Sequence, residues 1–128
     1  MNDRPNPLLL GSAVLYFAAA LPLLFAPDEL LAYAGVAPSI LDAALLQVIG
    51  SAIFGFSMLN WMNRFGVIGG IYGRPVVTAN FAHAGTAALL LGHIARRVPF
   101  SIPLVAVVVA YGVLAVAFGT RLFTAPTS

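Results

Sequence analysis

The sequence predicts an all-α membrane protein with four transmembrane helices. Apolar residues make up 61% of the 128 residues and charged residues only 8%, with a mean hydropathy of +0.99, whereas roughly a quarter of an average soluble domain is charged. One bilayer span needs about 20 apolar residues, and the chain holds four such runs separated by short segments. We therefore expect one four-helix domain over residues 1–128. Its spans are predicted at about residues 8–26, 40–62, 75–95 and 102–120.

The first span follows a polar segment that contains Arg4, an arrangement that resembles a signal peptide. The length of the run, Pro22 inside it and the spans that follow favour a retained transmembrane helix instead. Because proline lacks an N–H, it frees a carbonyl one turn earlier. A kink at Pro22 is therefore possible in this helix.

A short helix is predicted between the first two spans, and we expect it to lie at the membrane interface. It begins at Pro27–Glu29, because proline suits the first helical turn and acids complement the positive end of the helix dipole. Gly35 provides its end. Ser39 and Asp42 then have the spacing of a capping box, in which the serine and the acid each satisfy a backbone N–H. This box starts the second span near Ile40.

The segment before the third span is rich in glycine, from Gly66 to Gly73. It is consistent with a surface loop, a turn that lies against the membrane, or an early start of the third helix. It has neither G-x-G-x-x-G nor a Walker lysine, so close backbone packing or a bend explains it better than a phosphate site. Pro75 favours a helix that begins there, and Ser101 with Pro103 marks the start of the fourth span.

The arginines orient the predicted spans. With four spans, one side of the membrane holds four arginines, and the other holds two arginines together with acidic residues. The first side carries Arg4, Arg64, Arg74 and Arg121, and the second carries Arg96 and Arg97 with Asp28 and Glu29. The positive-inside rule then places both termini in the cytoplasm.

Several function classes are excluded by what the sequence lacks. Without cysteine there is no disulfide, thiolate metal site or cysteine nucleophile, and six scattered arginines are too few for a nucleic-acid surface. No Asp, Glu, Lys or Arg lies near the middle of a predicted span, and the capping box accounts for Asp42 at the start of the second. A proton-coupled exporter or a membrane sterol isomerase is expected to carry an acid in its central cavity. We predict no catalytic residue and no metal site.

Neutral or weakly basic polar residues remain on the second and third spans. On the second, Gln47, Ser51 and Gly55 share one face and predict its inward side; on the third, Asn80 and His83 share one side. Gln47, Ser51, Asn80 and His83 either hydrogen-bond one another across the helices or line a small pocket for a lipophilic ligand such as a quinone or a lipid. As a haem or metal ligand, His83 would need a partner or a homodimer to complete the site.

The third span carries two further patterns. A stripe of small residues, Ala84, Ala88 and Gly92, permits close helix packing. A basic cluster ends the span and is predicted at the interface, where cations complement the helix dipole and contact lipid phosphates. The cluster consists of His93, Arg96 and Arg97.

Four segments resemble the DoxX-like group of small bacterial membrane proteins. They are LLFAP at 23–27, LAYAGV at 31–36, IGSAIFGF at 49–56 and NWMNR at 60–64. The resemblance implies a four-helix protein of the bacterial inner membrane. Some members of that group are membrane subunits of quinone-linked oxidoreductases or of oxidative-stress complexes.

Two functional hypotheses follow. The first is a non-enzymatic membrane protein that acts by association, as a homo-oligomer or as a small subunit of a larger membrane complex, with lipids around it. The second is a subunit that binds a quinone or a lipid in a membrane redox system. The first is preferred because the sequence has no acid pair, no nucleophile with a base and no metal-ligand set.

Overall fold

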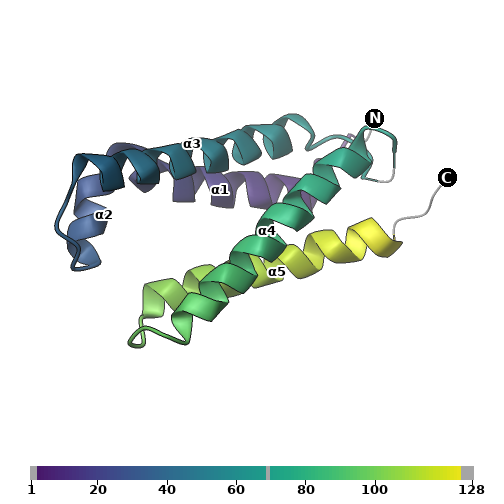
Figure 1. Ribbon diagram of the computed structural model, residues 1–128. Helices are drawn as coiled ribbons and strands as arrows, with labels where there is room; N and C mark the ends of the chain where they lie inside the picture. Colours follow the sequence, from purple (N-terminus) through teal and green to yellow (C-terminus); the bar gives the residue numbers. More distant parts are fainter. Residues whose placement is uncertain (1–2, 69, 125–128) are drawn as a thin grey trace. The chain divides into compact units, whose positions relative to one another are not determined.

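The computed structural model describes residues 3–68 and 70–124, so Gly69 of the glycine-rich segment lies outside the described residues. The described residues form five α-helices and no strand. These are α1 (Pro7–Phe25), α2 (Pro27–Tyr33), α3 (Ile40–Met62), α4 (Gly73–Ala95) and α5 (Ile102–Thr124), as Figure 1 shows. The prediction of an all-α chain is confirmed for this part of the chain.

Three of the described helices, α1, α3 and α5, are long and apolar enough to cross a membrane. The prediction of a membrane protein with transmembrane helices is confirmed at this level. Helix α4 is as long as α3 and α5, at 23 residues, but its mean hydropathy is lower.

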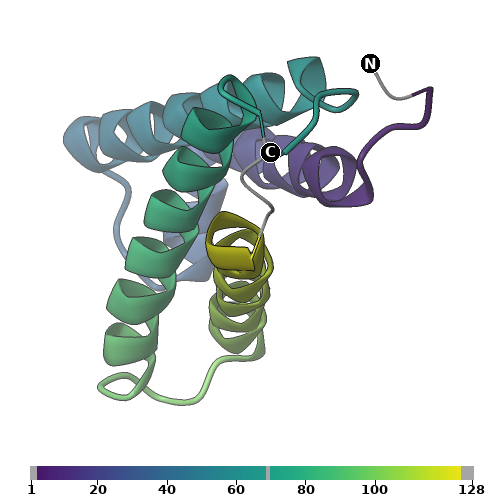
Figure 2. The same ribbon diagram turned by 90° about the vertical axis from the view of Figure 1, so that its right-hand side faces the viewer.

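The chain divides into two compact units, and each contains a pair of antiparallel helices. The first unit, Arg4–Arg64, contains α1, α2 and α3, and the second contains α4 and α5. Helix α1 lies along α3, and α4 lies along α5 (Figures 1 and 2). Below, these pairs are called the α1–α3 hairpin and the α4–α5 hairpin. The single domain predicted for residues 1–128 stays a prediction.

Side-chain caps set the starts of α1 and α3. The Asn6 side chain accepts hydrogen bonds from the backbone N–H groups of Leu8 and Leu9, at 3.0 and 3.4 Å. The Ser39 hydroxyl accepts from Asp42 N at 3.1 Å and donates to the Asp42 carboxylate at 2.6 Å. The predicted start of α3 is confirmed, but the acid bonds the serine hydroxyl rather than the backbone N–H expected for it.

Helix α2 ends at Tyr33, and Gly35 provides the stop as predicted. This glycine has a φ of 74°, in the left-handed region that glycine adopts without steric cost. Gly35 N donates to Ala32 O at 3.0 Å and Val36 N donates to Leu31 O at 2.9 Å. These two bonds form a Schellman motif, which satisfies carbonyls at the end of the helix.

Helix α4 begins two residues earlier than the predicted start at Pro75, at Gly73. Gly70 O accepts hydrogen bonds from Gly73 N and Arg74 N, at 3.0 and 3.1 Å. Pro75 is tolerated in the first turn because the first four N–H groups of a helix have no partner within it. Among the described residues between Asn63 and Tyr72 the chain forms turns and bends.

The buried residues of the α1–α3 hairpin follow the three- and four-residue spacing of two packed helices. They are Leu9, Ser12, Ala13, Tyr16 and Ala20 on α1, and Gly50, Ile53, Ser57 and Asn60 on α3. This face of α3 differs from the inward face predicted around Gln47, Ser51 and Gly55, which are exposed. The Ser51 hydroxyl donates to Val48 O of its own helix at 2.7 Å, and a serine satisfied in this way does not need a buried position.

Candidate functional site

Three polar side chains lie buried between α1 and α3. Asn60 Nδ2 donates to Ser12 Oγ at 2.9 Å, and Ser57 Oγ donates to the backbone carbonyl of Ala13 at 2.7 Å. Ser12 Oγ in turn donates to Leu9 O at 3.1 Å. Hydrogen bonds between helices in lipid contribute on the order of 0.6 to 2 kcal/mol each. These bonds therefore hold the hairpin together, and we call the three buried side chains, Ser12, Ser57 and Asn60, the polar seam.

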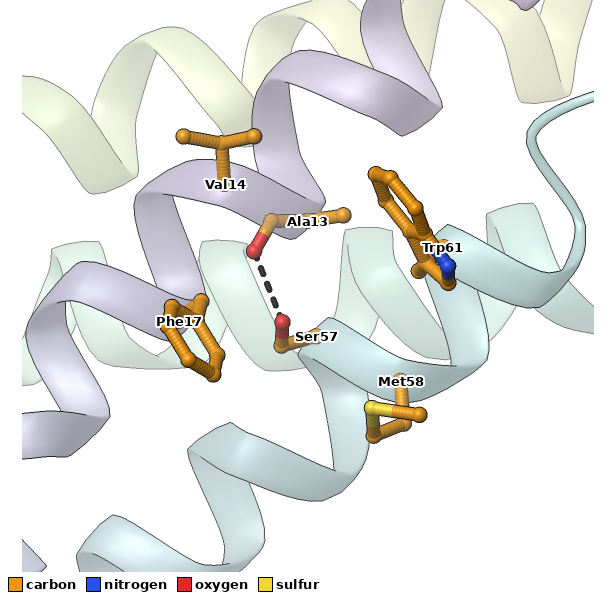
Figure 3. Close-up of a pocket in the computed structure, with 6 residues that line it drawn as sticks. All are labelled: Ala13, Val14, Phe17, Ser57, Met58 and Trp61. Carbon is orange, nitrogen blue, oxygen red and sulfur yellow. Dashed lines mark hydrogen bonds between the residues drawn. The ribbon is translucent and has the colours of Figure 1, made fainter.

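An apolar groove of about 310 Å³ lies beside this seam. Its walls come from both helices, as Figure 3 shows. They are Ala13, Val14 and Phe17 on α1, with Ser57, Met58 and Trp61 on α3. The volume is at the lower end of the range of small-molecule sites, about 300 to 1,000 Å³. We call this feature the α1–α3 groove.

Sequence reasoning did not predict this groove. The inward face of the second span was predicted at Gln47, Ser51 and Gly55, none of which lines the groove. A usable signal was the spacing of Gly50, Ile53, Ser57 and Asn60, which repeats every three or four residues and includes three small or polar residues. The polarity of Gln47 and Ser51 drew the prediction to the other side of α3.

The predicted site residues Gln47 and Ser51 lie on α3, in the first unit. Gln47 Nε2 donates to Leu24 O at 3.0 Å, in the last turn of α1. Carbonyls in the last turn lack a partner within the helix, so this bond stabilises the end of α1. The ligand-binding role of Gln47 and Ser51 stays a prediction.

The predicted site residues Asn80 and His83 lie on α4, in the second unit. Asn80 is fully buried and its amide donates to Val76 O at 2.9 Å. The half-buried His83 ring meets the Tyr111 ring of α5 edge to face, with centroids 5.4 Å apart. The Tyr111 hydroxyl lies 3.4 Å from His83 Nε2. Tyr111 was not predicted as a site residue.

The predicted small-residue stripe lies partly against α5 of the same hairpin. Ala84 is fully buried, and a Cβ placed on Gly92 would lie 3.8 Å from Val108 Cγ1. Ala88, between them, is half-buried. Substitution of these residues therefore tests packing inside the chain before it tests contact between chains.

The predicted basic cluster lies at the carboxyl end of α4, where the helix ends at Ala95. His93 and Arg96 are exposed, and Arg96 Nη2 lies 3.4 Å from His93 Nδ1. Arg97 follows directly and its backbone N–H donates to Ile94 O at 2.8 Å. Positive charge at this end is favourable because the carboxyl end of the helix dipole is negative.

Helix α5 carries a second hollow, on the face away from its buried residues Leu114 and Phe118. The hollow is shallow and has a volume of about 520 Å³. It is lined by Val109, Gly112, Val113, Val116 and Ala117. Nothing lies within 4 Å of a Cβ placed on Gly112. Within the α4–α5 hairpin the hollow is therefore open, and its lining is entirely aliphatic.

Comparison with protein-family models, curated proteins and solved structures found no match to this chain. The DoxX-like resemblance therefore stays a prediction.

Proposed function

We propose that this chain is a membrane protein with four spanning helices that acts by association, with a second copy or as a small subunit of a larger membrane complex. The observation that carries the proposal is the aliphatic hollow on α5. Small residues at a helix surface allow close approach of another helix in lipid. An interior glycine costs about 1 kcal/mol of helix stability relative to alanine, and in the described α4–α5 hairpin no side chain packs within 4 Å of a Cβ at Gly112 to offset that cost.

The proposal of a fourth span is supported by the way that α4 pairs with α5. The polar residues that lower the hydropathy of α4 include Asn80, which is buried in the hairpin, and His83, which contacts Tyr111. Phe81 contacts Phe123 near one end of the pair. A helix that lies along α5 in this way crosses the membrane with it, because α5 shields its polar groups from lipid.

In this proposal both termini face the cytoplasm of a bacterial inner membrane, in line with the DoxX-like resemblance. Its support is the count of four arginines against two on the two sides of four spans. Because the chain has no cysteine, single cysteines introduced at Arg4 and Arg97 can be labelled from one side at a time. We expect opposite labelling patterns, and identical patterns would contradict the four-span arrangement.

Disulfide cross-linking in the membrane tests association through α5. Val113→Cys places one thiol near the middle of α5, and Leu15→Cys places a control thiol near the middle of α1; both native side chains are exposed. We expect oxidation to give a cross-linked dimer for Val113→Cys alone. Adding Gly112→Leu fills the hollow and should abolish the dimer, whereas Gly11→Leu should not, since Gly11 is equally open but lies on α1.

A monomer in every case would exclude self-association through α5. Recovery of a stoichiometric membrane subunit that is lost with Gly112→Leu would then favour the subunit form of the proposal. If neither a dimer nor such a subunit depends on Gly112, the proposal that this hollow is an interface is wrong.

The contact between His83 and Tyr111 favours a second candidate, the binding of a quinone or a similar lipophilic ligand. Both side chains can hydrogen-bond a carbonyl oxygen in a largely apolar surrounding. Extraction of the purified protein followed by mass spectrometry should then find a quinone, and His83→Ala should reduce it. Absence of any co-purified quinone would contradict this alternative.

A further inference from the structure

The α1–α3 groove offers hydrocarbon contact over its whole length. Apart from the indole N–H of Trp61, the polar group in its lining is the hydroxyl of Ser57, which donates its proton to Ala13 O at 2.7 Å (Figure 3). The groove extends from Phe17, which contacts Phe54, to Trp61 next to the end of α3. Phe54 and Trp61 are seven positions apart on α3, which is roughly 10 Å along the axis. An occupant of this groove is therefore apolar and elongated.

A cation lies at the Trp61 end of the groove. The Arg64 guanidinium stacks on the Trp61 ring with its central carbon 4.1 Å from the ring centroid. Arg64 Nη1 also donates to Trp61 O at 2.6 Å. Asn6 N donates to Arg64 O at 2.6 Å, which fixes the backbone of Arg64 against the start of α1. The positive charge is thus held beside the mouth of an apolar groove.

The charges of this unit are separated between its two ends. Arg4 and Arg64 lie at the end where α1 begins and α3 finishes, and Asp3, next to Arg4 in the chain, offsets one of these two positive charges. The acidic residues of the unit Arg4–Arg64 lie at the opposite end, with Asp28 and Glu29 on α2 and Asp42 in the first turn of α3. The groove mouth therefore has a positive potential, which attracts an anion.

We propose that the α1–α3 groove binds one acyl chain of an anionic phospholipid, and that the Arg64 guanidinium binds its phosphate. An apolar tail joined to an anionic head matches the two parts of the site. A planar guanidinium suits phosphate oxygens and stacks on an aromatic ring at the same time. The positive-inside rule places this end at the cytoplasmic leaflet, where anionic lipids are concentrated. The inference goes beyond association through α5 and does not depend on it.

Tryptophan fluorescence gives a direct test, because Trp61 is the only tryptophan of the chain and lines the groove. The full chain is reconstituted in vesicles of unlabelled phosphatidylcholine. Phosphatidylglycerol or phosphatidylcholine with brominated acyl chains is then added in increasing mole fraction, since bromine quenches a tryptophan that it contacts. We expect half-maximal quenching at an about fivefold lower fraction of the anionic lipid, as one arginine near a membrane surface produces.

Two charge variants separate the site from general attraction. Arg64→Gln should remove the preference for phosphatidylglycerol, while Arg64→Lys keeps the charge and should retain most of it. Arg121→Gln is the matched control: it removes one positive charge from the last turn of α5 and should leave the preference unchanged. Equal loss in Arg64→Gln and Arg121→Gln would overturn the proposal in favour of non-specific electrostatics.

A groove variant tests the acyl chain. Val14 lines the groove and is exposed, so Val14→Phe fills the groove without crowding the seam. Quenching by both brominated lipids should then decrease. Equal quenching of the unmodified chain by the two lipids would overturn the proposal, because the groove would not select an anion. Absence of quenching would also overturn it and would show that protein covers the groove.

Discussion

Both hairpins have aromatic contacts between their helices, but in the α1–α3 hairpin buried polar side chains also bond across the seam, whereas the polar contact described between α4 and α5 is the long one from Tyr111 to His83. Asn60 and Ser57 donate to groups on α1. Phe81 meets Phe123 with ring centroids 5.9 Å apart, and His83 meets Tyr111. Lipid gives little hydrophobic driving force for helix pairing, so both dispersion contacts and hydrogen bonds can supply it. Among the described contacts, the first hairpin combines both kinds, and the second relies more on ring contacts.

The two hairpins also differ in how their charged residues are distributed between their ends. The first separates its arginines from its acids, as described above. The second has basic residues at both ends, with Arg74 and Arg121 at one end and the cluster of His93, Arg96 and Arg97 at the other. The orientation signal in the membrane therefore comes chiefly from the first hairpin, and early charges often dominate topology.

The largest expected effect comes from the glycine in each seam. A Cβ on Gly50 would lie 2.8 Å from Leu23 Cβ and 3.3 Å from a backbone carbon, so the helices must separate. A Cβ on Gly119 would lie 2.9 Å from Phe81 Cε2, at the edge of a ring that can rotate. Gly50→Ala should lower the free energy of unfolding by about 2 kcal/mol, as overpacking does, and Gly119→Ala by less than half of that.

Unfolding of each variant by titration with sodium dodecyl sulfate in mixed micelles measures both values. Gly11→Ala is the control, because Gly11 is open and alanine favours a helix. It should be neutral or slightly stabilising. If Gly119→Ala costs as much as Gly50→Ala, the Phe81 ring does not rotate to make room for the new methyl group, and the contrast between the two glycine positions is wrong.

The second-largest effect on stability is expected from the hydrogen bond between Asn60 and Ser12. A double-mutant cycle with Asn60→Ala and Ser12→Ala should give a coupling free energy of about 1 kcal/mol, within the range for hydrogen bonds between membrane helices. Ser51→Ala should change stability very little, because Ser51 bonds only a carbonyl of its own helix in the described contacts. Additive effects of Asn60→Ala and Ser12→Ala would show that the polar seam does not hold this hairpin.

Helix boundaries could be predicted because local signals determine them. Ser39 with Asp42 starts α3 at Ile40, and the described capping bonds explain why. Gly35 ends α2 because it adopts a positive φ. The start of α4 was missed by two residues, since the first turn accepts Pro75 at more than one position.

The packed face of α3 could not be predicted from polarity alone. In a soluble helix a polar residue marks the outer face, but in a membrane helix Ser51 satisfies its hydroxyl on Val48 O and needs no particular face. Asn60 and Ser57 are polar as well and are buried. Only their bonds to Ser12 and Ala13 in the folded hairpin distinguish these two buried residues from the exposed Ser51. Tyr111 was missed for the same reason, because its relation to His83 depends on how α5 pairs with α4.

The smallest effect is expected in the α4–α5 hairpin, from the hydroxyl of Tyr111. The distance of 3.4 Å to His83 Nε2 is long for a hydrogen bond, whose usual length is about 3 Å. Tyr111→Phe keeps the edge-to-face ring contact with His83 and should cost about 0.5 kcal/mol or less in the same detergent titration. Tyr111→Leu is the matched variant, because it also removes the ring, and it should cost more. If Tyr111→Phe instead costs as much as Asn60→Ala, a polar contact also dominates the second hairpin, and the distinction between a hydrogen-bonded and an aromatic seam fails.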